Sequence, residues 1–258
     1  MKFKNFNTAS VRKFIENTVP ELFERKRKHD LWLIMEAIHF VLKTGAQWRM
    51  LGDNYPPWQT VYYYYQKYYR EGVWEQLHDA LVMELRKQSG HPADPTYVII
   101  DSQTNRSDAF VYEEIGYDAG KKIKGRKRHI GVDSQGFLLA LIVHSAGIQD
   151  RNGFKELLME IKGKFPSIKI IYADGGYTGP IAESIAQELG FELRIVKRTD
   201  KEKKFQILPK RWVVERTFGW LRFYRRLNRE YEHIVEFATA SVITADTFAL
   251  MQKLAKQI

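Results

Sequence analysis

The sequence contains no cysteine among its 258 residues. This absence excludes disulfide bonds and cysteine-ligated metal sites, and it is typical of proteins in a reducing compartment. The sequence also lacks any apolar run near the ~20 residues of a membrane-spanning helix, and residues 1–5 lack the apolar core of a signal peptide. Internal repeats and low-complexity segments are absent as well. We therefore expect a soluble cytoplasmic protein.

Acidic residues are in the minority, with 31 Asp and Glu against 41 Lys and Arg, which gives a formal net charge of +10. Such an excess of positive charge indicates a polyanionic partner or an anionic membrane surface. Because no membrane segment is present, we favour nucleic acid, which would place the protein at the nucleoid. With 44% hydrophobic residues, the chain can bury a sizeable core in one large domain or two smaller ones.

The first 90 residues predict an all-helical domain for DNA binding or assembly, because apolar residues recur at helical spacing in several segments. Asp30 is a plausible N-cap and Gly45 a plausible C-cap of one helix. A basic cluster at residues 25–29 and a tyrosine-rich helix could contact DNA phosphates, although the tyrosines could instead fill the core of an ordinary helical domain. The expected helices span residues 8–17, 31–43, 58–72 and 74–87.

A polar linker at residues 88–95 leads into a second expected domain over residues 91–258, where the pattern changes to short β-branched runs. Asp133 to Gly136 is typical of a hairpin turn. The order of elements predicts an α/β domain with a ribonuclease-H-like mixed sheet flanked by helices. The expected strands are 97–101, 129–132, 137–143, 169–173 and 191–196, and the expected helices are 151–164, 180–189, 209–227 and 233–256.

Two of these strands end in an aspartate, Asp101 and Asp174. If the two strands are neighbours, both carboxylates lie at one edge of the sheet, where α/β proteins tend to place their chemistry. Close carboxylates repel each other unless a cation lies between them, and Mg²⁺ prefers carboxylate oxygens. Gly175 and Gly176 leave room beside Asp174 for a bulky ligand. The alternative is that Asp101 only caps a turn before Ser102.

Glu215 is the third acid that we select. On the expected helix over residues 209–227, Arg211, Glu215 and Arg222 lie within about 40° of one another, and the opposite face is largely apolar. The alternative is a surface ion pair between Arg211 and Glu215, which would contribute only ~0.3–0.5 kcal/mol. That pair does not account for the further arginines that make the end of this segment strongly basic.

The other acids and histidines have simpler explanations. Asp133 lies in the hairpin turn, and Asp150 lies immediately before a helix. The spacing of His29, His129 and His144 does not resemble a zinc-ligand pair, so we expect these histidines to be structural or to face phosphates.

Residues 121–129 carry six lysines and arginines in nine positions. A charge run is usually a solvated face. This one leads into a strand beside the proposed acids, which favours a track for a nucleic-acid backbone with salt-dependent binding. Together with the arginines near Glu215, the candidate DNA-binding residues are Lys121, Lys122, Lys124, Arg126, Lys127, Arg128, Arg211, Arg222, Arg225 and Arg226.

Several motifs together resemble bacterial insertion-sequence transposases of the DDE type, close to family five of those elements and related to family four. The most specific are ADGGY at residues 173–177 and VERTFGWL at residues 214–221. The matching motifs extend over nearly the whole chain. The others are KHD at 28–30, TGAQWR at 44–49, PPWQTVY at 56–62, DS at 101–102 and KRH at 127–129.

The resemblance implies that Asp101, Asp174 and Glu215 are the catalytic and metal-binding acids, with two Mg²⁺ or Mn²⁺ ions as cofactors. It also implies cleavage at the ends of an insertion sequence followed by joining to target DNA. The expected partners are the terminal inverted repeats, the target DNA and a second copy of the chain, as a homodimer on DNA.

The segment around Glu215 matches the tyrosine, arginine, glutamate and lysine signature of family four with one departure. Arg211 fills the arginine position, and Arg222 stands where lysine is usual. Leu208 replaces the tyrosine. This change affects an expected contact with flanking DNA phosphates but not the metal chemistry.

Two other functions stay open at this point. The chain could be a transposase-derived DNA-binding protein that has lost catalysis, which metal-dependent DNA nicking would distinguish. It could also be a ribonuclease-H-like nuclease without end specificity, which a comparison of inverted-repeat with random DNA would decide.

Overall fold

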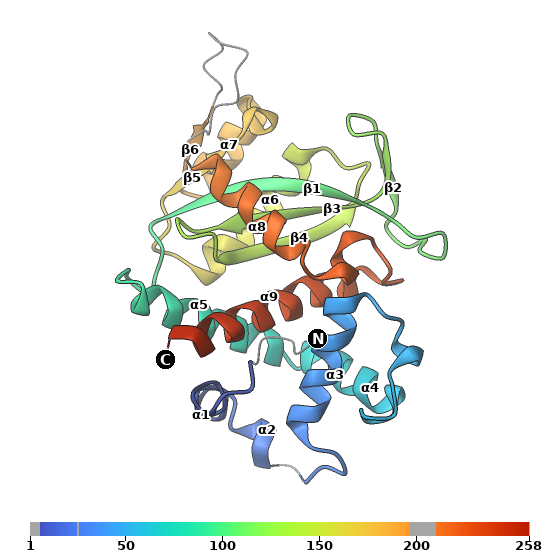
Figure 1. The fold of residues 1–258 in the computed structure, drawn as a ribbon. Helices are drawn as coiled ribbons and strands as arrows, with labels where there is room; N and C mark the ends of the chain where they lie inside the picture. Colours follow the sequence, from blue (N-terminus) through green and yellow to red (C-terminus); the bar gives the residue numbers. More distant parts are fainter. Residues whose placement is uncertain (1–5, 25, 197–209, 258) are drawn as a thin grey trace. The chain divides into compact units, whose positions relative to one another are not determined.

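The computed structural model describes residues 6–24, 26–196 and 210–257 (Figure 1). Arg25, Leu208 and Pro209, which enter the predictions above, lie outside these residues. The chain forms two compact units. The helical unit comprises Met1–Ala93, Leu221–Asn228 and Glu236–Ile258, and the sheet unit comprises Asp94–Trp220 and Arg229–Val235. No helix among the described residues is long and apolar enough to cross a bilayer.

The helical unit confirms the expected helices to within two residues at each end. The Asp30 carboxylate accepts a hydrogen bond from the Trp32 amide, and Gly45 ends that helix in the left-handed conformation, with φ +74°. The helices are α1 (Ala9–Thr18), α2 (Glu21–Glu24), α3 (Leu31–Thr44), α4 (Trp58–Arg70), α5 (Val73–Gln88) and α9 (Val235–Gln257), with the 3₁₀ turns η1 (Trp48–Met50) and η3 (Arg225–Asn228).

The tyrosine-rich helix α4 is divided between core and surface. Tyr65 and Tyr68 are buried, and the Tyr65 hydroxyl lies 2.9 Å from the Ser241 hydroxyl on α9. Tyr63 is 56% exposed. The core-filling interpretation therefore holds for two of these tyrosines, while Tyr63 remains available at the surface.

The C-terminal helix α9 completes the core of the helical unit, although its residues follow the sheet in the sequence. Phe248 of α9 packs against Trp74 of α5, with ring centroids 5.5 Å apart, and against Phe6. The compact units thus differ from the predicted division at residue 90 in the placement of α9, because apolar periodicity does not reveal which core a helix joins. As functional domains, 1–90 and 91–258 stay a prediction.

A buried ion pair joins α5 to α9 and should make the helical unit sensitive to alkaline pH. His78 Nε2 lies 3.0 Å from Asp246 Oδ2, and His78 is 4% exposed. Burial lowers the pKa of His78, but the hydrogen bonds to Asp246 and Asp79 outweigh it and raise this pKa to about 9. Because folding raises the pKa of His78, protonated His78 stabilises the folded state. This contribution to the free energy of unfolding is complete below about pH 6.5, the pKa of His78 in the unfolded chain, and is lost as the pH rises through about 9.

We therefore expect the wild-type protein to lose up to about 3 kcal/mol of unfolding free energy between pH 6 and pH 10 through this group. Thermal melts across that range would measure the loss. His78→Gln should remove most of this alkaline slope, and an unchanged slope in that variant would contradict the assignment.

The sheet unit is built on a six-stranded mixed sheet in the order β2-β3-β1-β5-β6, with β4 paired to β3 (Figure 1). β1 and β3 run antiparallel, whereas β1, β5 and β6 run parallel. The strands are β1 (Tyr97–Arg106), β2 (Gly116–Asp118), β3 (Ile123–Val132), β4 (Leu138–Ser145), β5 (Ile170–Ala173) and β6 (Glu192–Ile195). The helices are α6 (Asp150–Lys164), α7 (Pro180–Glu188) and α8 (Arg211–Leu221), with the 3₁₀ turn η2 (Gly175–Tyr177).

Helices α6 and α8 cover opposite faces of this sheet. Successive residues of a strand point to opposite faces. Ser102 of β1 donates a hydrogen bond to Asp150 at the start of α6, and its neighbour Asp101 interacts electrostatically with Arg211 at the start of α8. The predicted mixed sheet flanked by helices, consistent with a ribonuclease-H-like domain, is confirmed.

Several boundaries differ from the prediction. Strands β1 and β3 each extend several residues beyond the predicted segments, because the polar residues 102–106 pair with the basic residues 125–129 across the sheet. Strand β2, which was not predicted, pairs with the start of β3. Helix α8 ends at Leu221, so the predicted helix to residue 227 is too long.

Candidate active site

Asp101 and Asp174 lie side by side on neighbouring parallel strands. Ile99 of β1 pairs with Tyr172 of β5, so two residues further along each strand Asp101 comes level with Asp174. Asp174 lies immediately after the end of β5, whereas β1 continues to Arg106. The predicted juxtaposition of the two carboxylates is therefore present, although Asp101 lies within its strand rather than at its end.

Mutual repulsion and burial both act on this pair. Burial, and to a smaller extent the charge of Asp174, raise the pKa of Asp101 to about 6. The Ser102 amide, which donates to Asp101 Oδ1 at 2.7 Å, opposes that shift, as do Arg211 and Lys121. A carboxylate in this setting is ionised more readily when another cation approaches it.

Arg211 connects Asp174 to the third acid. Its guanidinium lies 3.1 Å from Glu215 Oε1 and 3.7 Å from Asp174 Oδ2. Helix α8 presents these side chains because Val213, Val214 and other apolar residues of its opposite face are buried. The surface ion pair between Arg211 and Glu215 is thus real, but the same guanidinium also reaches Asp174.

The donor chemistry of the three acids fits a hard divalent cation, because all three offer carboxylate oxygens and two of them adjoin. In this conformation, no three acids or histidines among the described residues are grouped closely enough to hold a metal ion. Arg211 contacts both Asp174 and Glu215, so Glu215 reaches the aspartates through a positive charge rather than directly. Displacement of Arg211 would remove the cation that now contacts both Asp174 and Glu215.

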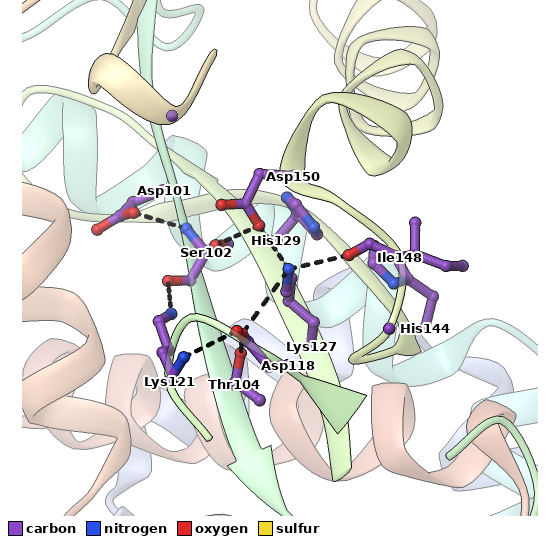
Figure 2. A network of polar contacts seen from close by, with 12 residues as sticks. Asp101, Ser102, Thr104, Asp118, Lys121, Lys127, His129, His144, Ile148 and Asp150 are labelled. Atoms are coloured by element: carbon purple, nitrogen blue, oxygen red, sulfur yellow. Dashed lines mark hydrogen bonds and ion pairs between the residues drawn. The ribbon is translucent and has the colours of Figure 1, made fainter. Parts of the chain in front are cut away.

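The opposite face of β1 carries a polar network that the sequence did not reveal (Figure 2). Lys127 Nζ lies 2.8 Å from Asp150 Oδ1 and donates to the Ile148 carbonyl oxygen at 2.9 Å. The same Asp150 oxygen accepts a hydrogen bond from the Ser102 hydroxyl at 3.0 Å. Burial raises the pKa of Asp150, but Lys127 outweighs this effect and lowers it. The network fixes the residue that follows Asp101.

Asp118 and Tyr177 extend this support. Thr104 donates to Asp118 Oδ2 at 2.6 Å, and Lys127 lies 3.9 Å from the same oxygen. The buried Tyr177 hydroxyl lies 3.0 Å from His129 Nδ1, so the turn after Asp174 is tied to β3. These contacts could not be predicted from local sequence, because they depend on how β1, β3 and the turn after Asp174 come together in the fold.

The basic run at residues 121–129 is only partly exposed, which corrects the prediction that all six of its cations line a nucleic-acid backbone track. Lys121, Lys122 and Lys124 are exposed, but Arg126, Lys127 and Arg128 are buried. The buried cations lie on β3, which is paired with β1 and β4, and internal partners compensate their charge. Arg126 donates to three backbone carbonyl oxygens, those of Glu113, Glu232 and His233, and Arg128 is paired with the buried Glu230.

The remaining candidate arginines also separate by exposure. Arg222 and Arg225 are exposed and belong to the helical unit. Arg226 is 8% exposed and donates to the Ala46 carbonyl oxygen, so it is not a surface residue as predicted. Arg211 is partly buried between the acids described above.

Comparisons with known proteins agree with this architecture. Residues 92–244 match the family described as "Transposase DDE domain", and residues 11–78 match that described as "Putative transposase of IS4/5 family". A curated protein of Burkholderia cepacia, "Putative transposase for insertion sequence element IS402", is 33% identical over 115 residues, which are 42% of this chain and 54% of that protein. The chain thus spans about half the length of this relative. The resemblance drawn from the motifs is confirmed, and the chain belongs to the transposase DDE domain family.

Proposed function

We propose that this protein is a DNA transposase that cleaves the ends of an insertion sequence and joins them to target DNA. The observation that carries the proposal is the placement of two acids side by side, with a third acid connected to them through one arginine. Asp101 and Asp174 adjoin in register, and Arg211 links Asp174 to Glu215. The match to the DDE domain family supports a catalytic role for this arrangement.

Asp101, Asp174 and Glu215 are the residues that would hold divalent cations, with two Mg²⁺ or Mn²⁺ ions as the expected cofactors. Such ions stabilise both the attacking and the leaving oxygen of an in-line phosphoryl displacement. The chain itself would orient the reacting DNA. Arg211 can donate hydrogen bonds to a phosphate in place of its present carboxylate partners. Ser102, held by Asp150, keeps Asp101 in position.

The partners proposed are the terminal inverted repeats, target DNA and a second copy of the chain, because joining two ends requires both to be held together. Lys121, Lys122 and Lys124 remain the exposed candidates for backbone contact near the acids, and Arg222 and Arg225 are those of the helical unit. A net charge of +10 is consistent with a polyanionic partner.

Cleavage of a labelled duplex that carries the element end tests this function. We expect cleavage that depends on Mg²⁺ or Mn²⁺, stops with EDTA and favours the element end over a scrambled duplex of equal length. Binding to the end without cleavage under any of these metals would favour a catalytically silent DNA-binding protein. Equal cleavage of both duplexes would favour a nuclease without end specificity.

A further inference from the structure

A pocket in the sheet unit lies beyond the candidate acids, at the far end of β1. It has a volume of about 390 Å³, within the usual range of ~300–1,000 Å³ for small-molecule sites. Arg106, Lys122 and Lys124 supply positive charge, and Val111 and Ile115 supply apolar surface, at its lining. We propose that this pocket binds one unpaired nucleotide of a DNA strand, an inference that rests on the proposed function.

The charges of the pocket favour a phosphate. Within the described part of the chain, no acid forms an ion pair with Arg106, Lys122 or Lys124. The acid in the lining, Asp108, is already 3.5 Å from Arg229. Three uncompensated cations around a concave site attract an anion, and lysine and arginine are the usual donors to DNA phosphates.

The aromatic and apolar lining favours a base. Tyr117 lines the pocket and is 58% exposed, and Phe110 and Tyr112 in the preceding segment are 76% and 82% exposed. Exposed aromatic rings beside cations are the usual platform for unstacked bases. A base that is still paired would bring its complementary strand with it, and a pocket of this size cannot hold both. The bound nucleotide must therefore be unpaired.

The backbone at Lys122 is an independent sign that this side chain is used. Lys122 has φ +55°, in the left-handed region that favours glycine, within the turn from β2 to β3. A lysine tolerates that conformation at an energetic cost. Glycine would fit the turn better, so a lysine at this position is consistent with a use for its ammonium at the pocket that it lines.

The pocket faces the same side of the sheet as Asp101. Lys124, which lines it, precedes Ile130 by six residues along β3, and Ile130 is paired with Asp101, so Lys124 and Asp101 share a face. At ~3.3 Å per residue the two positions are ~20 Å apart. That distance corresponds to about six nucleotides of a DNA strand, so one strand could reach both.

Binding of three labelled DNAs, measured by fluorescence anisotropy in EDTA, tests the proposal. The DNAs are a duplex, the same duplex with one bulged thymidine, and the corresponding single strand, with free thymidine monophosphate as a competitor. We expect the wild type to prefer the bulged duplex and the single strand over the perfect duplex by about fivefold or more, the range of one base–aromatic stack. If millimolar thymidine monophosphate competes but the wild type shows no preference for the bulged duplex or the single strand, the pocket binds free nucleotides and the proposal is overturned.

Tyr117→Ala should abolish that preference. Lys124→Ala should weaken binding to all three DNAs and reduce the slope of log affinity against log salt concentration by about 1, the contribution of one phosphate contact. Lys122→Gly should weaken binding while leaving the thermal midpoint equal or higher, because it relieves the backbone. Lys162→Ala, an exposed lysine on α6, is the matched control and should bind like the wild type. Unchanged preferences in Tyr117→Ala and Lys122→Gly would overturn the pocket alone. A wild type that binds none of these DNAs would overturn the proposed function with it.

Discussion

Replacing Asp101 with asparagine should reduce metal-dependent cleavage of element-end DNA by about a thousandfold or more. Metal ions contribute several kcal/mol to phosphoryl displacement, and each 1.36 kcal/mol is a factor of ten in rate. Asparagine keeps the shape of the side chain but removes the negative charge, so the pair formed with Asp174 can no longer attract a divalent cation strongly. Asp174→Asn and Glu215→Gln should act in the same way.

The controls separate lost chemistry from lost folding. Asp94→Asn changes an exposed aspartate at the start of the sheet unit, and Glu183→Gln changes an exposed glutamate of α7. Both should cleave at the wild-type rate. Asp101→Asn should keep its thermal midpoint and DNA affinity while it loses cleavage. Full cleavage by Asp101→Asn would remove the assignment of this residue.

Replacing Glu230 with glutamine is expected to be the most destabilising conservative change in the sheet unit. Glu230 is 1% exposed, is paired with Arg128 and lies 3.9 Å from Arg126, which is completely buried. Removing one partner of a buried pair costs about 3–5 kcal/mol, because the other charge remains without compensation. The thermal midpoint should fall by roughly 6–20 °C.

Glu71→Gln provides the matched surface comparison. Glu71 forms an ion pair with Lys67 on α4 at 3.8 Å, and its side chain is 47% exposed. Such pairs contribute only ~0.3–0.5 kcal/mol, so this variant should melt within about 2 °C of the wild type. Equal small shifts in both variants would show that Glu230 does not compensate the buried arginines.

Much of the candidate site followed from local sequence. Apolar runs ending in Asp101 and Asp174 predicted two strands whose carboxylates would meet if the strands were neighbours, and parallel pairing in the same register brings those residues together. Helical spacing placed Arg211 beside Glu215, which their 3.1 Å contact bears out. These features depend on residues close in sequence or on the regular repeat of a helix or strand, so they could be predicted without knowledge of the tertiary structure.

The buried charges could not be predicted in the same way. A run of six cations is normally a solvated face, and here half of it lies inside the sheet. Lys127 is compensated by Asp150, and Arg128 by Glu230, which lies about a hundred positions further along the chain. Which acids face a basic strand is a property of the tertiary structure. For the same reason, the sequence predicts Asp150 only as a residue at the start of a helix.

The most direct test of the shared site is Mn²⁺ binding to the protein in complex with element-end DNA, measured by electron paramagnetic resonance. The wild type should bind Mn²⁺ at a site that Mg²⁺ competes for, and Asp101→Asn, Asp174→Asn and Glu215→Gln should each weaken that binding, whereas Asp94→Asn should not. If any one of the three variants bound Mn²⁺ with the affinity and stoichiometry of the wild type, the claim that these acids hold cations together would be contradicted.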